Sequence, residues 1–371
     1  MKKIGTELIS IIVTNYNKEK YIERCLNSIV NQTYKKFEVI IIDDDSTDKS
    51  YSIISKFITD KRFKYIKTNK IGNSFAKNFG AKLCKRNFIT FLDSDDFWEK
   101  NFLKEVSNLI KKYPSAGAYI TGYRRIYNKG LDKVKYSNKK KTGIIFDYFK
   151  RRLDPDSWGI HTSSIVFRKN KFDNTDGFPS LIFSNTKKEF LMIDKNFKKL
   201  FDLKFENFNI YENPKKSRNI KKCDKYLKFN LKRYLNYKVL FVLSGEDQYL
   251  HDKFFLENKI AFSNKILSNW DGTISNQSTK YFREKKFLPH LLMLTKKIEK
   301  NKKLLRNKSL LHYIYYIIVS SGSKINQQFY LNYNLNNFIV SYKVFYKKII
   351  LFKYKYKFSR LKHRYLSFLN V

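Results

Sequence analysis

Short apolar strands alternate with helices in the first part of this 371-residue chain. Apolar runs rich in β-branched residues, at residues 9–13, 37–42 and 88–92, each end at a polar loop. Between them, apolar residues recur at helical spacing, for example over residues 21–30 and 74–85. Repeated strand-helix units form a parallel sheet with helices on both faces. We therefore predict an α/β fold, with a mixed, mostly parallel sheet flanked by helices.

Carboxylates gather at the ends of two of these strands. Asp93, Asp95 and Asp96 follow the strand at 88–92, and the loop at 43–48 contains four more aspartates. The carboxyl ends of parallel strands meet at one edge of the sheet, where ligands commonly bind. Carboxylates at such an edge repel one another unless a cation or hydrogen-bond donors are bound there. Because Mg²⁺ and Mn²⁺ take one or two carboxylates together with a diphosphate, the sequence predicts a divalent-metal site.

Both acidic loops also have a purely structural interpretation. Aspartates after a strand often form a turn and cap the next helix, so Asp96 or a neighbour would cap a helix that begins near Glu99. Residues 46–48 would cap the following helix in the same way. Asp43 and Asp44 precede that cap, and a carboxylate there could instead accept hydrogen bonds from a uracil-type base or from a ribose.

The composition is strongly basic. Lys and Arg number 76 against 33 Asp and Glu, which gives a formal net charge of +43. Such a charge causes self-repulsion unless an anionic partner, such as nucleic acid, acidic lipid or a polyanionic glycan, lies near. Three cysteines without metal-ligand spacing favour a reducing compartment over a disulfide framework.

The apolar segments of the chain predict no membrane span. No apolar signal segment follows Met1, and the longest apolar stretches, such as residues 310–319, are shorter than the roughly 20 residues that a span needs. We therefore expect a cytoplasmic protein, and peripheral binding to the inner face of the cell membrane is left open.

Three segments together resemble the family 2 glycosyltransferases, which have the GT-A fold. They are residues 9–17, 37–48 and 72–96, in the order and spacing of that family. The resemblance implies an inverting enzyme that uses a nucleoside-diphosphate sugar, with UDP-sugars favoured, and Mn²⁺ or Mg²⁺ as cofactor. It also implies a metal motif of Asp93 and Asp95, with Asp95 the better candidate for direct ligand. The nucleotide-sugar contacts that it implies are Thr14, Tyr16, Asp44, Asn73, Lys77 and Asp93.

Two positions depart from the family pattern. Asp45 stands where the family more often has glycine, and aspartate tolerates a left-handed turn better than most residues. Lys77 stands where arginine is usual, which keeps the charge but loses the bidentate fork. We expect these changes to alter donor affinity or identity rather than the fold.

A second part of the resemblance lies at residues 245–250, preceded at a distance by residues 161–168 and 176–179. It implies that Asp247 is the general base that removes the proton of the acceptor hydroxyl, and that Glu246 contacts the acceptor or orients the site. The alternative is an ordinary acidic first turn of a helix. The family often closes over the diphosphate with a His- or Arg-bearing segment, for which His251 and Arg283 are only weak matches.

Two regions differ from the rest of the chain in length or composition. Residues 1–280 are predicted to form the GT-A domain, with an insertion at about 181–244 where the family has a short connection. Residues 281–371 are basic, aromatic-rich and predicted to be mainly helical. Such helices could lie on an anionic membrane near a lipid-linked acceptor, or form a bundle with lysine-rich faces.

The leading hypothesis is an inverting, metal-dependent glycosyltransferase that acts on a glycan or lipid-linked acceptor in bacterial surface polysaccharide or lipopolysaccharide synthesis. The alternative is a basic nucleic-acid-binding protein without catalytic activity, which the charge of +43 favours. Because the acidic strand-end loops would repel phosphates unless a metal intervened, we do not expect nucleic acid to be the partner.

Overall fold

The computed structural model describes most of the first half of the chain and one later segment. The described residues are 7–69, 72–127, 130–137, 139–152, 159–175, 177–178, 181–184, 189–192 and 246–273. The chain divides into two compact units, residues 1–146 with 160–281 and residues 147–159 with 282–371. The predicted helical region at 281–371, and most of the predicted insertion, lie outside the described residues. The sheet and the candidate site described below lie in the first unit.

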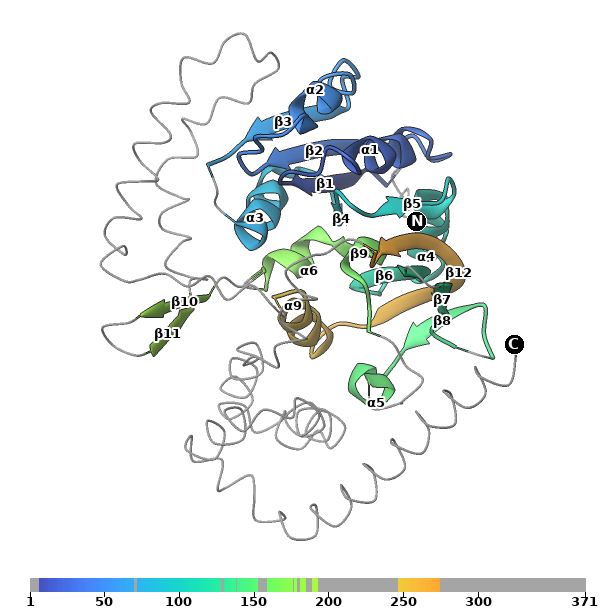
Figure 1. Cartoon of the computed structure of the whole chain (residues 1–371). Coiled ribbons are helices and arrows are strands. Elements are labelled where there is room, and N and C mark those ends of the chain that lie inside the picture. The colour runs from blue at the N-terminus through green and yellow to red at the C-terminus, as the bar shows by residue number, and fades with distance from the viewer. Residues whose placement is uncertain are drawn as a thin grey trace. The chain divides into compact units, whose positions relative to one another are not determined.

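Strands and helices alternate along the first unit (Figure 1). The strands are β1 (Ile9–Asn15), β2 (Phe37–Asp43), β3 (Phe63–Lys67), β4 (Phe88–Asp93), β5 (Phe97–Trp98), β6 (Ala118–Tyr127), β7 (Gly130–Val134), β8 (Thr142–Ile145), β9 (Ile165–Arg168), β10 (Leu181–Ser184), β11 (Glu189–Met192) and β12 (Ile260–Asp271). The helices are α1 (Ile22–Val30), α2 (Ser50–Ile54), α3 (Asn73–Leu83), α4 (Phe102–Lys112), the 3-10 helix η1 (Thr162–Ser164), α6 (Lys169–Asp173) and α9 (Glu246–Phe255). The short helix α5 (Tyr148–Arg152) belongs to the second unit.

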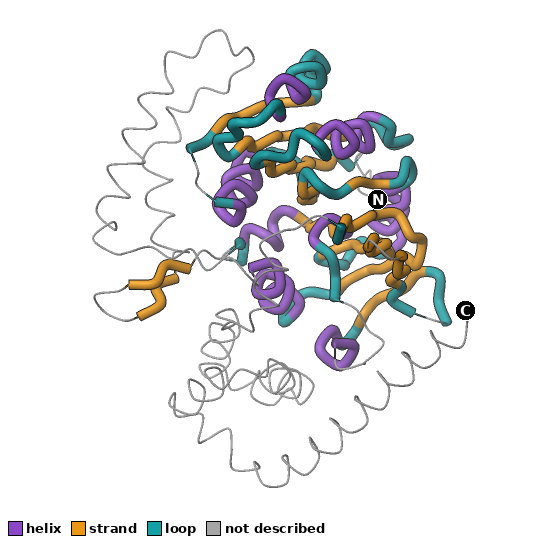
Figure 2. Tube along the Cα trace, viewed as in Figure 1, coloured by secondary structure: helices purple, strands orange, loops and turns teal. Residues whose placement is uncertain are grey.

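Ten strands of the first unit form one mixed sheet, and β10 pairs with β11 in a separate antiparallel sheet. The order of the mixed sheet is β3-β2-β1-β4-β9-β6-β12-β5, with β7 paired to β6 and β8 paired to β12. The four strands from β3 to β4 are mutually parallel, and β12 runs parallel to β6. The antiparallel additions β5, β7, β8 and β9 are short, and helices lie on both sides of the sheet (Figure 2). The predicted α/β fold is confirmed.

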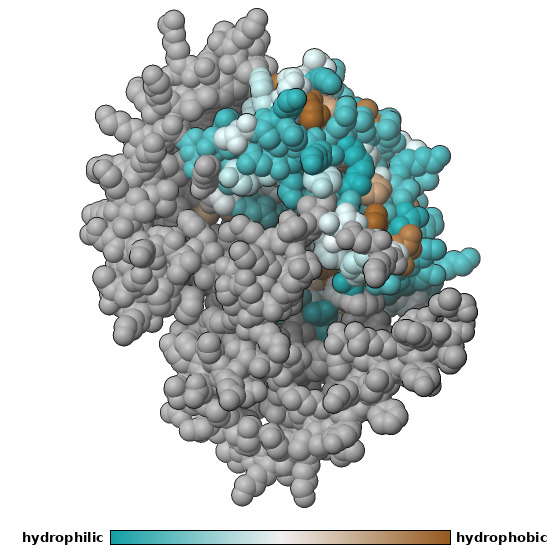
Figure 3. Space-filling model, in the orientation of Figure 1, coloured by the Kyte–Doolittle hydropathy of each residue, from teal (hydrophilic) through white to brown (hydrophobic). Residues whose placement is uncertain are grey.

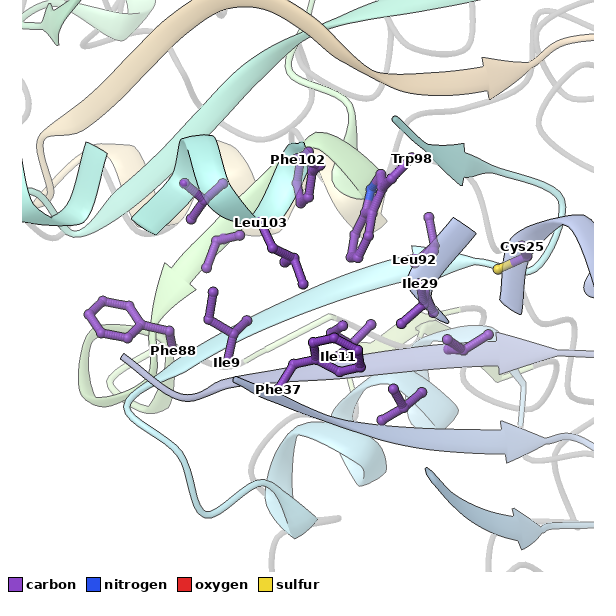
Figure 4. Packing of buried hydrophobic residues seen from close by; sticks show 14 of the residues in the cluster. Ile9, Ile11, Cys25, Ile29, Phe37, Phe88, Leu92, Trp98, Phe102 and Leu103 are labelled. Carbon is purple, nitrogen blue, oxygen red and sulfur yellow. The ribbon is translucent and has the colours of Figure 1, made fainter. Parts of the chain in front are cut away.

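Burial of apolar side chains on both faces explains why these segments form strands. All seven residues of β1 are buried, as expected for a central strand covered on both sides. On one face, side chains of β1 and β4 meet α1 and α4, and the indole of Trp98 stacks on the ring of Phe102 at 4.3 Å (Figure 4). On the other face, α3 lies close to β1 because Gly80 has no side chain, and a Cβ there would come 2.4 Å from Ile12. This close packing fixes α3 against the strand edge.

One local expectation needs correction. The helix expected to begin near Glu99 begins at Phe102 instead, and its first turn is capped by Gln32, whose Oε1 accepts from the Leu103 amide at 2.9 Å. Residues 97–98 form strand β5, which pairs with β12. No local pattern in the sequence indicated a strand of two residues that depends on a distant partner.

The described surface gives no sign of a membrane span. None of the described helices is both long and apolar enough to cross a bilayer. The visible face of the described part is mostly hydrophilic, with small scattered apolar spots (Figure 3).

Candidate functional site

The register of the parallel strands brings distant loops to one edge of the sheet. Thr14 at the end of β1 lies opposite Asp93 at the end of β4, and Asn15 lies opposite Asp43 at the end of β2. The Thr14 hydroxyl donates to Asn73 Oδ1 at 2.9 Å and lies 3.4 Å from Asp93 Oδ1. The ends of β1 and β4 therefore meet the first residue of α3 at this edge.

The loop after β2 uses its carboxylates within the protein. Asp43 is buried and accepts hydrogen bonds from the Ser46 amide and the Tyr65 hydroxyl, both at 2.9 Å. Asp48 accepts from the amides of Glu19 at 2.9 Å and Ser50 at 3.0 Å, and Ser50 is the first residue of α2. The predicted capping role of residues 46–48 therefore fits Asp48, and Asp43 has a structural role of its own.

Asp44, a predicted nucleoside contact, also faces inward. Its carboxylate accepts from the Thr68 hydroxyl and from the Gly72 amide, both at 2.8 Å. Since Gly72 immediately precedes α3, Asp44 ties the loop after β2 to the start of that helix. The adjacent Asp45 has φ +67°, the left-handed conformation expected where the family more often has glycine.

Tyr16 is placed differently from the buried residues of this edge. It follows β1, and 48% of its surface is exposed. An exposed aromatic ring at the edge of the sheet can provide a face for a nucleobase to stack on.

The loop after β4 is held by cationic side chains. The Lys18 ammonium lies 2.8 Å from Asp95 Oδ2. Arg24 donates to the Asp95 carbonyl oxygen and to the Asp271 carboxylate, each at 2.8 Å. This arrangement joins α1, the acidic loop and the end of β12, which are far apart in the sequence.

Asp96 has a structural role, although it is not the predicted helix cap. Its carboxylate accepts from the Ser163 hydroxyl at 2.5 Å and from the Asp271 amide at 3.3 Å, and His161 Nε2 lies 3.3 Å away. Burial raises the pKa of Asp96 well above its ordinary value, and the neighbouring aspartates raise it further. Burial also lowers the pKa of His161 to about 3, so this imidazole is neutral.

Lys77 connects the acidic loop with α9. Its ammonium lies 3.1 Å from Asp93 Oδ1 and 3.3 Å from Asp247 Oδ1, and only 1% of its side chain is exposed. Burial raises the pKa of Asp93, and the Lys77 charge opposes that rise. Burial also tends to raise the pKa of Asp247, but Lys77 together with the neighbouring side chains of His251, Thr162 and His161 outweighs it, so the net pKa lies below its ordinary value. Asp247 is therefore ionised at neutral pH.

The Asn78 side chain holds the backbone of Phe178, whose ring lies beside Lys77. Asn78 donates to the Phe178 carbonyl oxygen and accepts from the Phe178 amide, both at 2.8 Å. Gly177 has φ +70°, and a Cβ at this position would lie 2.2 Å from Asn78 Oδ1, so glycine is required. The Phe178 ring centroid lies 5.1 Å from the Lys77 ammonium, within cation-π range.

A helix begins beside Asp247, the predicted general base, as expected. Helix α9 begins at Glu246, and 37% of the Asp247 side chain is exposed. The side chain of Glu246 lies outside what the structure describes, as does Arg283. His251 is buried on α9, with its ring 6.3 Å from that of Phe167 and 5.9 Å from that of Phe255, which does not suit a residue that closes over a diphosphate.

The chemistry of the acidic loop fits a divalent cation held together with a diphosphate. No group of three or more metal-ligating side chains occurs within the described residues. A Mg²⁺ ion bound to a nucleotide needs only one or two carboxylates, which Asp93 and Asp95 can provide. Each of these carboxylates already lies beside an ammonium group, so a metal ion would have to bind alongside that positive charge or replace it.

Sequence reasoning missed several residues that contact the acidic loop. Lys18 lies in the loop after β1, and this position at the edge of the sheet was the available sign that it could contact the acidic loop. Arg24 and Asp271 are 247 positions apart, and His161 precedes η1. Nothing in the sequence indicated that these residues meet.

Comparisons with known proteins agree with this geometry. Residues 10–175 match the family described as Glycosyl transferase family 2. The chain is 40% identical to the glycosyltransferase GlyA of Streptococcus pneumoniae over 106 residues, which cover 28% of this chain and 15% of GlyA. It is 46% identical over 93 residues to WfaP of Escherichia coli, named UDP-Glc:alpha-D-GlcNAc-diphosphoundecaprenol beta-1,3-glucosyltransferase, covering 25% of this chain and 37% of WfaP. The chain thus spans less than half the length of these relatives.

A solved structure shows the same fold. The crystal structure of S. aureus TarS in complex with UDP-GlcNAc superposes with a TM-score of 0.55 at 18% identity, covering 84% of this chain and 73% of that one. The mixed sheet, the acidic strand-end loops and the family match lead to one conclusion: residues 10–175 are similar to glycosyl transferase family 2, and the described part of the chain has the GT-A fold.

Proposed function

We propose that the chain is an inverting glycosyltransferase. It transfers a sugar from a nucleoside-diphosphate donor to a glycan or lipid-linked acceptor in bacterial surface polysaccharide or lipopolysaccharide synthesis. The observation that carries the proposal is the Lys77 bridge. The buried Lys77 ammonium lies 3.1 Å from Asp93 Oδ1 and 3.3 Å from Asp247 Oδ1. The carboxylate proposed to bind the donor and the candidate base are therefore neighbours of the same side chain.

Asp247 acts as the general base. The acceptor oxygen attacks the anomeric carbon as the bond from that carbon to the diphosphate oxygen breaks, and the diphosphate leaves with the bonding electron pair. The hydroxyl proton passes to the Asp247 carboxylate, whose lowered pKa keeps it ionised and able to accept the proton at neutral pH. Glu246, at the start of the same helix, is proposed to contact the acceptor or orient the site.

The strand-end residues bind the donor. We propose that Tyr16 stacks on the base, that Thr14, Asn73 and Asp44 line the nucleoside side, and that Lys77 and Asp93 lie near the sugar diphosphate. A Mn²⁺ or Mg²⁺ ion at Asp95 and Asp93 would neutralise the diphosphate when bound. A UDP-sugar donor is supported by the printed names of WfaP and of the TarS complex, which specify UDP-Glc and UDP-GlcNAc for those proteins.

The acceptor and its location are inferred from the relatives and from the charge. The relatives' names specify a diphosphoundecaprenol-linked sugar for WfaP and poly(ribitol-phosphate) for TarS, both carbohydrate or polyol acceptors of bacteria. The net charge of +43 would favour peripheral binding to the anionic inner face of the cell membrane. We further propose that residues 1–280 form the catalytic domain, and that 281–371 and the 181–244 insertion serve acceptor or membrane binding.

A donor panel tests the proposal. Thermal unfolding of the full chain is measured with UDP-, GDP- and dTDP-sugars, each with and without Mn²⁺, and with oligonucleotides at increasing salt. Stabilisation by one donor supports the proposal, and dependence of that effect on Mn²⁺ supports the metal. Salt-sensitive stabilisation by oligonucleotides alone would instead favour a nucleic-acid-binding protein.

A further inference from the structure

Lys18 is built into the edge of the sheet rather than extended freely from its surface. Its backbone amide donates to the Ser50 hydroxyl at 3.2 Å, and its carbonyl oxygen accepts from the Tyr21 amide at 2.9 Å. These contacts fix the residue between β1 and α1. The ammonium then reaches Asp95 Oδ2 at 2.8 Å, while the side chains of Lys18 and Asp95 keep 23% and 17% of their surfaces exposed.

The two lysines beside the acidic loop, Lys77 and Lys18, differ in how far their side chains are exposed to solvent. Lys77, beside Asp93, is 1% exposed and is also held by Asp247 and by the Phe178 ring. Lys18, beside Asp95, is partly exposed. Arg24 contacts the Asp95 backbone carbonyl rather than its carboxylate. Among the described residues, Lys18 is therefore the side-chain cation at Asp95 that an incoming ion meets first.

We propose that Lys18 is a built-in counter-ion of Asp95 that competes with a divalent cation and so sets the metal affinity of the acidic loop. The inference rests on the proposed function only in that Asp95 takes a divalent cation. An ammonium 2.8 Å from a carboxylate oxygen repels a second cation there, and burial weakens the screening of this repulsion by water. To bind Asp95, a metal ion must therefore either displace the Lys18 ammonium or bind beside it at a cost in affinity.

The same residue stabilises the loop without metal. Asp93, Asp95 and Asp96 lie within four consecutive residues at the end of β4, so their carboxylates repel one another. A positive charge at Lys18 offsets part of this repulsion. When Lys18 is neutralised, the metal-free protein should lose stability that a bound divalent cation restores.

The test is a titration of the full chain with Mn²⁺ alone, by calorimetry and by thermal unfolding. Lys18→Met removes the charge and keeps a similar length, Lys18→Arg keeps the charge, and Lys20→Met is the matched control at an exposed lysine two residues away. We expect Lys18→Met to bind Mn²⁺ about five- to tenfold more tightly than the unaltered chain. Lys18→Arg and Lys20→Met should stay within about twofold, and the rise in Tm on adding Mn²⁺ should be largest for Lys18→Met.

Three results would overturn the inference: equal or weaker Mn²⁺ affinity in Lys18→Met, the same gain in Lys20→Met, or no Mn²⁺ binding by any variant. If Lys18→Met does not fold, Lys18→Gln provides the neutral variant for the same comparison with Lys18→Arg. Binding of a nucleoside-diphosphate sugar in the presence of EDTA is measured separately. Donor binding with no effect of Lys18 on Mn²⁺ would refute the counter-ion role and leave the transferase proposal standing.

Discussion

The two acidic loops of the sheet edge look alike in sequence but differ in what neutralises them. In the loop after β2, the Asp43 and Asp44 carboxylates accept hydrogen bonds from hydroxyl and amide groups of the protein. In the loop after β4, the Asp93 and Asp95 carboxylates lie beside the ammonium groups of lysines. Hydrogen bonds of the first kind fix a backbone, whereas an ammonium can be exchanged for another cation.

The difference separates a fixed scaffold loop, which can contact the donor without moving, from a loop whose cations can be exchanged. A buried carboxylate whose oxygens accept directed hydrogen bonds would leave its donors unpaired if it turned toward a ligand. A carboxylate that is compensated by charge loses less when one cation replaces another. The first loop therefore shapes the edge of the sheet, and the second is the part that we expect to exchange ions.

The largest effect is expected from Asp95→Ala. Loss of this ligand should lower transfer activity more than about a hundredfold and remove the dependence of donor binding on Mn²⁺. Because Asp95 forms only a partly exposed ion pair, the free energy of unfolding should change by less than about 1 kcal/mol. Activity assays and urea unfolding measure both quantities, with Asp173→Ala, an exposed aspartate, as control. A strongly destabilised Asp95→Ala would show that the two loops are alike.

Asp247→Asn tests whether Asp247, which Lys77 joins to the loop after β4, is the general base. We expect turnover to fall by about two to four orders of magnitude, because the amide cannot accept the acceptor proton. Donor binding, measured by calorimetry, should remain within about threefold, since the amide oxygen can still accept from Lys77. Full turnover by this variant would remove Asp247 from the role of base.

Asp43→Ala tests the scaffold loop. The substitution leaves the Tyr65 hydroxyl and the Ser46 amide without their acceptor, so the free energy of unfolding should fall by about 2–4 kcal/mol. The Mn²⁺ affinity of the folded protein should change less than about twofold. An unchanged unfolding free energy, or a large loss of Mn²⁺ affinity at full stability, would contradict the assignment of this loop to structure.

The smallest effect is expected from Asp45→Gly. The φ of +67° is strained for aspartate and free for glycine, which favours the variant. Loss of the Lys67 ion pair at 3.3 Å, which is partly exposed, offsets part of this gain. The net increase in unfolding free energy should be about 0.5 kcal/mol, visible as a Tm rise of about 1–3 °C. A lower Tm would mean that the ion pair outweighs the backbone strain.

Local patterns carried much of the fold in advance. The apolar runs at 9–13, 37–42 and 88–92 are central strands because their side chains are buried on both faces, a property that hydrophobicity reports directly. Strand β5 was missed because it has two residues and exists only through pairing with β12. Such a strand has no local signal.

The site was predictable in part. Parallel strands end at one edge, so the placement of Thr14 and Asp93 at the same edge followed from the repeated strand-helix units. The different roles of Asp43 and Asp95 did not follow, because they depend on Tyr65 and Lys18, which approach from other elements. Sequence located the carboxylates, and their partners required tertiary structure.

The most direct test of the account is pulsed EPR of Mn²⁺ bound to the full chain with UDP. The account predicts a protein-bound Mn²⁺ signal with phosphorus couplings from the diphosphate, present in the unaltered chain and in Asp43→Asn and absent in Asp95→Ala. A bound signal that persists in Asp95→Ala, or one without phosphorus couplings in the unaltered chain, would contradict the claim that the loop after β4 holds a cation together with the donor diphosphate.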